Sequence, residues 1–353
     1  MSRSNPTVLW RGNLQDLVPT NPWGLALGLV VGAIRWFMIL LTVCLTLPVL
    51  TIAAPQTQEG AWTALQKAQH ASQRLSYQGV LSIQSGRYSQ SSRVVHVWDA
   101  QQGELESLET LDGQPVEWIR RNDEVQCIAH ESKTVRMEKR SRPDAFSDLL
   151  SAKAEELADF YTLTQKEIER VAGLDSQVFE LRPKDGLRYG HRFWIDKDSG
   201  LLVKAQTLDE TDTVLEQVAF SEIKVGSVPE KSKPRFKPVG DGWKLEKNVS
   251  VVNETALANF TLKYNIPGFR RVSEMARRKQ TVTVSQFVYS DGLASVSLFV
   301  EPFDASKPLP PAVMNHGAVK SQVRKVGDFS VTVMGEVPLA TIKQFIAAVE
   351  VKK

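Results

Sequence analysis

The sequence predicts an α+β protein with two domains, and three observations support this prediction. Between residues 77 and 223, short runs of alternating apolar and polar residues recur, separated by turn sequences such as "DAQQG" and "LDGQP". A stretch with three prolines, 225–242, interrupts that pattern. A hairpin pattern and an apolar helical stripe follow it. We therefore expect an open, curved antiparallel barrel backed by helices, then a linker, then a smaller α+β domain.

The elements of the first domain follow from their periodicity. Residues 58–75 repeat apolar positions at helical spacing, with Ala61, Leu65 and Ala68 on one face, and predict an amphipathic helix. The run "PDAFSDLLSAKAEELADFY", 143–161, predicts a second helical region that begins at a proline. The expected strands are 77–84, 92–98, 104–110, 115–121, 124–129, 166–171, 176–182, 188–195, 201–208 and 213–223.

The segment 225–242, "VGSVPEKSKPRFKPVGDG", is rich in proline and charge and predicts an extended, semi-rigid linker after a first domain at 55–224. The second domain is expected at 243–353. Its hairpin, 281–301, places Asp291 and Gly292 at the tip, a dipeptide that favours type I′ turns. Strands at 317–326 and 329–335 lead to a closing helix that starts at Pro338.

The N-terminal residues 1–54 have the pattern of a cleaved secretory signal peptide. Arg35 precedes the uncharged run from Trp36 to Ala54, which ends in small residues. A membrane anchor is the alternative, because nineteen residues can just span a bilayer. The part before Arg35 is long for such a leader and suggests a downstream translation start. Removal of the leader leaves Cys127 alone, so no internal disulfide is expected.

Charge and motif content exclude several functions. The formal charge is only +3, which does not fit a nucleic-acid binder. The chain has no phosphate-binding loop, HExxH, CxxC or GxSxG motif, and its five histidines are scattered, so we expect no cofactor, no metal and no enzyme activity. Asp196 and Asp198 are better explained by a tight turn than by a calcium loop. A hydrolase that uses His191 with Asp196 or Asp198 is kept as an alternative.

The run "GLRYGHRFWIDKDSGLL", 186–202, is the most distinctive in the chain. An extended strand would place Tyr189 and Phe193 on one face and Trp194 on the other, so both faces carry large aromatic side chains. Such a strand either lies between two layers or lines a cavity. These aromatic residues either fill the barrel core or line a cleft for an acyl chain. The cleft hypothesis names Trp98, Trp118, Tyr189 and Phe193.

Four segments give the chain a strong resemblance to a known family. They are "LDGQPVEWIRRNDEVQCI", the run from "RVAGLDSQVFEL" through "GLRYGHRFWIDKDSGLL" to "FSEIKVG", "VYSDGLASVSLFVE" and "VTVMGEVPLATIKQF". With collinear similarity from Trp62 to Val349, the sequence resembles the RseB/MucB family, the regulators of the envelope-stress sigma factor.

The resemblance implies a LolA/LolB-like unclosed barrel, a smaller C-terminal domain and a periplasmic location. It also implies binding to the periplasmic part of an RseA/MucA-like membrane anti-sigma factor, which would shield that factor from proteolysis. Release would follow binding of lipoprotein or lipopolysaccharide acyl chains. A periplasmic lipoprotein carrier or lipid-binding chaperone is the alternative. The sequence leaves homo-oligomerisation open, and the basic run 270–279 is either a site for an acidic partner segment or a solvated loop.

Overall fold

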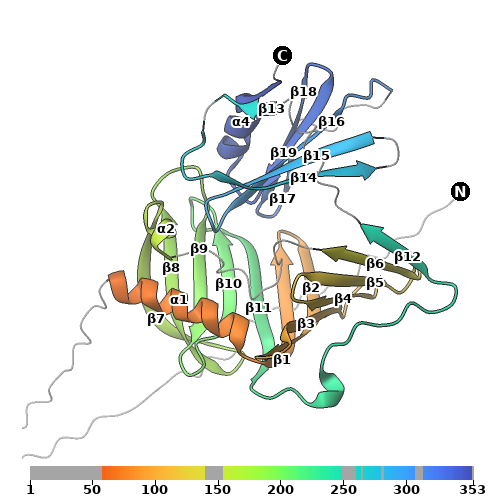
Figure 1. The fold of residues 1–353 in the computed structure, drawn as a ribbon. Coiled ribbons are helices and arrows are strands. Elements are labelled where there is room, and N and C mark those ends of the chain that lie inside the picture. Colours follow the sequence, from red (N-terminus) through yellow and green to blue (C-terminus); the bar gives the residue numbers. More distant parts are fainter. Residues whose placement is uncertain are drawn as a thin grey trace, which may run out of the picture. The chain divides into compact units, whose positions relative to one another are not determined.

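The computed structural model describes residues 58–139, 154–248, 260–263, 265–279, 282–306 and 313–351. These residues form two large antiparallel sheets with a few helices, which confirms the predicted α+β class (Figure 1). The leader expected in residues 1–54 and the first part of the helical region, 143–153, lie outside the described residues. None of the helices in the described part has the length and hydrophobicity that a bilayer span requires.

Twelve strands of the described chain form the first sheet, in the order β12-β6-β5-β4-β3-β2-β1-β11-β10-β9-β8-β7. Neighbouring strands are antiparallel except for β12 and β6, and the two edges, β7 and β12, do not pair with each other. The sheet is therefore the predicted unclosed barrel. Its strands are Tyr77–Ser85 (β1), Tyr88–Asp99 (β2), Gly103–Thr110 (β3), Val116–Arg121 (β4), Glu124–Ala129 (β5), Thr134–Lys139 (β6), Tyr161–Val171 (β7), Leu174–Pro183 (β8), Gly190–Asp196 (β9), Leu202–Leu208 (β10), Val214–Val225 (β11) and Lys244–Asn248 (β12).

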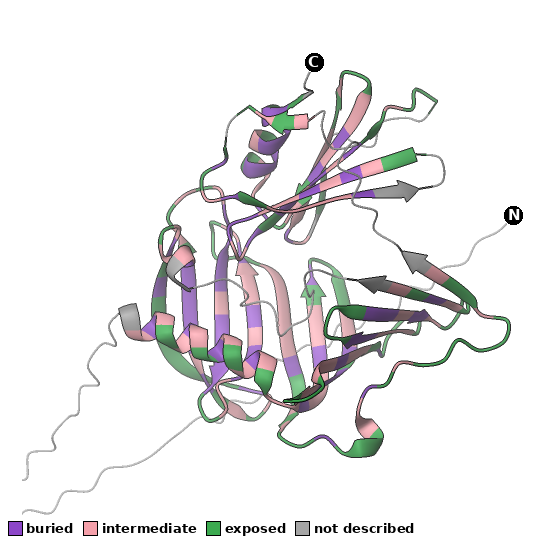
Figure 2. Ribbon diagram, in the orientation of Figure 1, coloured by how far each residue is buried: buried purple, intermediate pink, exposed green. Residues whose placement is uncertain are grey.

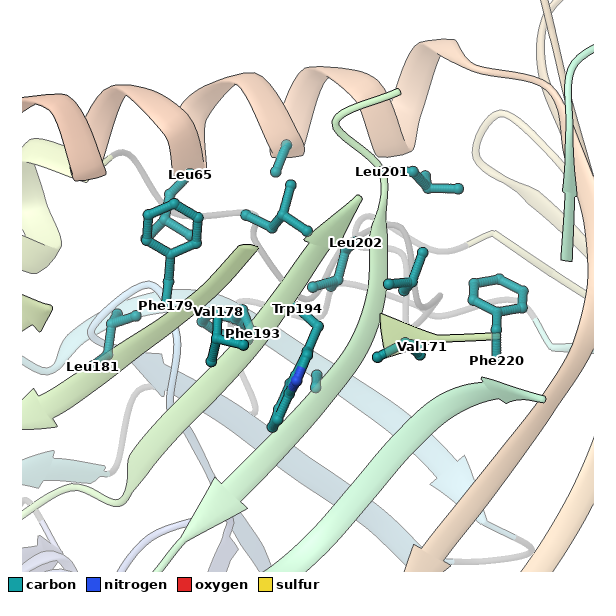
Figure 3. Close-up of a cluster of buried hydrophobic side chains, with 14 of the residues drawn as sticks. Leu65, Val171, Val178, Phe179, Leu181, Phe193, Trp194, Leu201, Leu202 and Phe220 are labelled. Carbon is teal, nitrogen blue, oxygen red and sulfur yellow. The ribbon is translucent and has the colours of Figure 1, made fainter. Parts of the chain in front are cut away.

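Helix α1, Gln58–Arg74, lies across one face of this sheet and closes its core. Ala61, Leu65 and Ala68 are buried, as the helical spacing predicts. Figure 2 shows buried residues concentrated in β8, β9 and β10 and on the face of α1 turned towards them. In Figure 3, Phe179 points towards Leu65 of α1. Burial of these side chains supplies the main stabilising free energy of the domain, about 25 cal/mol per Å² of apolar surface.

Strands β6, β7 and β12 of the first sheet differ from the sequence-based expectation, which had no strand at Lys244–Asn248. Strand β6 was not predicted, because its alternating pattern is only six residues long and carries several charges. Strand β7 begins at Tyr161, five residues before the expected strand, and the helix described in this region, α2, spans only Ala154–Ala158. The apolar spacing of the helical region continues into the strand through Tyr161, so periodicity alone places the boundary too late.

The proline-bearing segment 225–242 is extended, as predicted, apart from one short 3₁₀ turn at Glu230–Ser232 (η2), and it packs against the first sheet. The Gln126 side chain makes two hydrogen bonds to the backbone of Lys237, of 2.7 and 2.8 Å. Phe236 and Trp243 pack on the small core around Ile119. The chain then enters β12 beside β6, so the residues immediately after the segment belong to the first sheet.

Six strands of the described residues form the second sheet, in the order β14-β15-β16-β19-β18-β17. They are Arg270–Lys279 (β14), Val282–Ser290 (β15), Ser295–Pro302 (β16), Val313–His316 (β17), Val319–Val326 (β18) and Phe329–Gly335 (β19). Helix α4, Leu339–Ala348, covers one face with Ile342, Phe345 and Ile346, and Pro338 is its N-cap residue. A small pair, Phe260–Leu262 (β13) and Val349–Val351 (β20), completes the domain. The basic run 270–279 is thus an edge strand and not a loop.

The tip of the β15–β16 hairpin differs from a two-residue type I′ turn. Ser290 pairs with Ser295, and residues 291–294 form the loop. Gly292 has a φ of +105°, whereas Asp291 does not adopt a positive φ. Instead, one carboxylate oxygen of Asp291 accepts hydrogen bonds from the backbone N–H groups of Leu293 and Ala294. The hydrogen-bonding capacity of the aspartate, and not the φ preference of a primed turn, shapes this tip.

Candidate functional site

A buried polar cluster joins the first sheet to the second. The connection between β8 and β9 carries Arg188, whose Nε donates to Oδ2 of Asp291 at 2.6 Å. Its Nη2 donates to the carbonyl of Pro267 at 2.6 Å, and its Nη1 donates to Asp185. We call these residues, with the hydroxyl of Tyr161, the Arg188 cluster. Side chains of both Arg188 and Asp291 have no solvent exposure, so the pair is fully removed from water.

Two aromatic rings enclose the guanidinium of Arg188. Its Cζ lies 4.5 Å from the ring centroid of Phe160 and 4.9 Å from that of Phe269. Gly268 sits between these groups with a φ of +79°, and a Cβ at this position would collide with Arg188 Nη2 and with the Phe160 ring. A planar cation that stacks on rings while its edge donates hydrogen bonds is a role that arginine fills and lysine does not.

Asp291 accepts four hydrogen bonds within the buried cluster. Its Oδ2 accepts from Arg188 and from the Tyr161 hydroxyl at 3.0 Å, while Oδ1 accepts from two backbone N–H groups. Burial, and next the charge of Asp291, raise the pKa of Tyr161 well above its usual range, so this hydroxyl stays a donor. Each member of the cluster thus satisfies hydrogen-bonding groups of another.

His191 lies close to this cluster and does not form a catalytic pair. Burial lowers the pKa of His191 to about 4, an effect that Asp291 partly opposes. Its ring stacks on Phe193 with centroids 6.0 Å apart, and Nε2 has no hydrogen-bond partner. Asp196 is on the opposite face of β9 by strand alternation and bonds instead to Ser199, and Asp198 is exposed in the following turn. The structure does not bring together the groups that the hydrolase alternative requires.

The four residues of the lipid-cleft hypothesis are distributed as follows. Strand registers place Trp98, Trp118 and Phe193 on the same face of the first sheet, the face that α1 covers. Phe193 is part of the core, whereas Trp98 and Trp118 are half-buried, and the guanidinium of Arg74 lies 5.3 Å from the Trp98 ring. Tyr189 is buried in the β8–β9 connection. Their role in lipid binding stays a prediction.

The opposite face of β9 explains why the strand is apolar on both sides. Trp194 points away from α1 (Figure 3). Its indole N–H donates to Glu169 at 2.8 Å, and the ammonium of Lys204 lies 4.0 Å from its ring centroid. Two long charged side chains thus cover part of this tryptophan, which is only 2% exposed and also belongs to the buried apolar cluster of the domain.

Beside the Arg188 cluster lies a pocket of about 750 Å³. It is within the size range of ligand sites in proteins. Asp291 forms part of its wall, and none of the four residues of the lipid-cleft hypothesis lines it. Its apolar lining comprises Phe160, Phe260, Leu262, Ile266, Phe269, Phe287, Tyr289 and Leu298, and its charged lining includes Glu156, Asp159, Arg270 and Arg271.

A second polar cluster, in the first sheet, has residue types that can hold a metal. Side chains of His96, Glu104 and Glu106 approach within 4.8 Å of one another. However, Nη2 of Arg120 lies 2.5 Å from Glu104 and 2.7 Å from Glu106, where a cation would have to sit. His96 Nε2 also bonds to Glu104 at 2.9 Å, and its Nδ1 to the Leu75 carbonyl at the end of α1. The donor set fits an arginine ion-pair network that fastens α1 to the sheet.

The sequence did not mark Arg188 and Asp291, the centre of the candidate site, as functional residues, although it placed Asp291 at a hairpin tip. Both lie in segments that carry the family resemblance, "GLRYGHRFW" and "VYSDGLAS", and that is the only signal for them. Strand alternation describes only neighbouring residues. It therefore could not predict that these two residues meet, because 103 positions separate them.

The fold and the site define a class: a two-domain protein that offers surfaces for binding. A family model described as the MucB/RseB N-terminal domain matches residues 60–239, and one for the MucB/RseB C-terminal domain matches 254–350. The chain therefore belongs to the MucB/RseB family.

Relatives agree with this assignment. The sigma factor AlgU regulatory protein MucB of Pseudomonas aeruginosa is 27% identical over 302 residues, covering 83% of this chain and 92% of the relative. The sigma-E factor regulatory protein RseB of Escherichia coli K12 is 25% identical, covering 68% of this chain and 75% of the relative. The structure of the Pseudomonas aeruginosa MucA/MucB complex superimposes with a TM-score of 0.66 at 25% identity, covering 83% of this chain and 99% of that one.

Proposed function

We propose that this protein is a periplasmic negative regulator of an envelope-stress sigma factor. It acts by binding the periplasmic part of a membrane anti-sigma factor and holding it in a form that proteases do not cut. The match of both domains to the MucB/RseB family models carries this proposal. It is supported by the solved complex of MucB, a relative at 25% identity, with MucA.

The physical basis of shielding is mass action. A protease needs an accessible, extended segment, and a binder that occupies the segment lowers the accessible fraction in proportion to its affinity and concentration. The Arg188 cluster supports such a role, because it joins the two domains and leaves the edge strand β14 of the second sheet available for binding.

Lipid sensing is the regulatory half of the proposal. An acyl chain that binds preferentially to the partner-free form must weaken partner binding by the same factor, by thermodynamic reciprocity. Burial of an acyl chain releases about 0.8 kcal/mol per CH₂, so an apolar surface is sufficient to bind it and no catalytic group is required. Trp98, Trp118, Tyr189 and Phe193 remain the residues proposed for this contact.

The decisive experiment uses residues 55–353 and the periplasmic domain of the anti-sigma factor encoded in the same genome. We expect saturable binding by calorimetry and slower cleavage of that domain by its envelope protease when this protein is added. Deletion of the gene should raise expression of a sigma-dependent reporter. Absence of binding together with an unchanged reporter would overturn the proposal.

The carrier alternative makes a different prediction in a pull-down from envelope fractions. A carrier recovers lipoproteins in general and no anti-sigma factor. A regulator recovers the anti-sigma factor, and added lipid reduces the recovery.

A further inference from the structure

Strand β14 is a long edge strand without a partner on its outer side in the described residues. It spans ten residues, Arg270–Lys279, and pairs only with β15 in the second sheet (Figure 1). An edge strand presents a row of unpaired backbone N–H and C=O groups that can accept another extended chain. The other edge of this sheet, β17, has only four residues, so β14 offers the longer template.

The pocket described above is contiguous with this edge. Arg270 and Arg271, the first residues of β14, line it, together with Phe287 and Tyr289 of the neighbouring strand. Side chains of an extended segment alternate in direction. A segment that runs beside β14 can therefore place one or two large apolar side chains in the pocket, where they would contact half-buried rings such as Phe260.

The charge of β14 limits what can pair with it. Its sequence, RRVSEMARRK, has five basic residues and one glutamate, a formal charge of +4. Arg271 is 54% exposed and pairs with Glu274 in an exposed contact, which is a weak interaction that a partner carboxylate can replace. A second copy of this chain is disfavoured, because pairing two β14 strands would oppose two sets of like charges.

We propose that the outer edge of β14 and the adjoining pocket bind one extended peptide segment with acidic residues and a large apolar anchor. This inference rests on the proposed function and assigns the segment to the periplasmic part of the anti-sigma factor. An acyl chain is a poorer fit, since it would use neither the backbone groups of the edge nor the basic side chains of β14.

The first test compares two charge reversals in the full mature chain. Arg271→Glu removes one basic residue from β14. Lys263→Glu is the matched control, since Lys263 is 50% exposed and also makes one exposed ion pair, with Glu350. With the periplasmic domain as probe, we expect Arg271→Glu to weaken binding about tenfold and Lys263→Glu to leave it unchanged. A circular-dichroism melt checks that both variants fold.

The second test measures amide hydrogen exchange along β14 in the unmodified protein. Exchange of the amides of residues 271–276 should slow at least about tenfold when the periplasmic domain binds, and exchange in β17 should not change.

A third test changes the pocket. Leu262→Asp in the pocket should weaken binding of the periplasmic domain, whereas Ile168→Asp on β7, an exposed apolar residue of the other sheet, should not.

The outcomes separate the two proposals. Binding without protection of β14, with equal effects of the two charge reversals, overturns this inference and leaves the proposed function standing. Protection of the pocket residues by dodecyl phosphate micelles but not by the periplasmic domain also overturns it, because the pocket would then be an acyl site. If the periplasmic domain does not bind at all, the proposed function fails and this inference fails with it.

Discussion

Arg188 and Asp291 form an ion pair whose two side chains are completely buried, with Nε and Oδ2 2.6 Å apart. Arg188 lies in the β8–β9 connection of the first sheet, and Asp291 lies in the β15–β16 loop of the second sheet. A buried charge is tolerated only when its hydrogen-bonding capacity is satisfied, and here Asp185, Tyr161 and the Pro267 carbonyl complete the set. The pair therefore ties the position of the second domain to the β8–β9 connection.

Arg188→Ala should lower the free energy of unfolding by about 3–5 kcal/mol, because Asp291 is left buried without its cation. Arg93→Ala is the control: its pair with Glu109 is about half exposed and should cost 0–1 kcal/mol. The double variant Arg188→Met, Asp291→Leu should lose less free energy of unfolding than Arg188→Met or Asp291→Leu alone. Urea unfolding measures this free energy for each variant. Equal losses for Arg188→Ala and Arg93→Ala would contradict the stabilising role of the buried ion pair.

Gly268→Ala should destabilise the protein more than Gly242→Ala. Both glycines have a φ near +80°, so both variants incur the left-handed backbone penalty, about 1–2 kcal/mol. Only at Gly268 does the added Cβ also collide with Arg188 and Phe160, whereas nothing lies within 4 Å at Gly242. Thermal melts of the two variants give the difference, and similar melting temperatures would show that the Arg188 cluster adapts without cost.

Stability should fall as pH decreases from about 6.5 to 4 through the titration of His191. The pKa of His191 is lowered to about 4 in the folded protein by burial, so in this window the unfolded chain binds a proton that the folded protein does not. The expected loss is roughly 3 kcal/mol from the 1.36 kcal/mol per pH unit of linkage. His191→Gln should remove this slope, and His70→Gln, on the exposed face of α1, should not. Urea titrations at several pH values test both.

Gln126→Ala should release the segment that follows β11. The Gln126 side chain is buried and makes both of its hydrogen bonds to the backbone of Lys237, so its removal should cost about 1–3 kcal/mol. Hydrogen exchange at the Lys237 amide should accelerate. Gln90→Ala removes an exposed hydrogen bond with Tyr88 and serves as the control. An unchanged Lys237 amide would mean that Phe236 and Trp243 alone hold the segment.

Much of the fold could be predicted from the sequence because its signals are local. The spacing of Ala61, Leu65 and Ala68 predicted α1, and the stripe through Ile342 and Ile346 predicted α4. Most strands followed from alternation and turn residues. Strand β6 was missed, since a short charged run carries little periodic signal. The basic run 270–279 allowed two interpretations, and sheet pairing decided in favour of a strand.

The candidate site could not be predicted in the same way. The sequence predicted Asp291 as a turn residue and Arg188 only as the first residue of an expected strand. What makes them a site is the burial of the ion pair and the stacking of the Arg188 guanidinium on Phe160 and Phe269, which are properties of the packed chain. The aromatic run 186–202 drew attention to the correct segment, but for its rings and not for its arginine.

By itself, the sequence determined the two-domain α+β organisation and the family, because periodicity, turn residues and collinear motifs depend on residues that are close together in the chain. The tertiary structure alone decided that Arg188 meets Asp291, that β12 joins β6, and that β14 is an edge beside a pocket. These contacts join residues far apart in the chain. Their energies depend on burial and on simultaneous satisfaction of several partners, which no local pattern encodes.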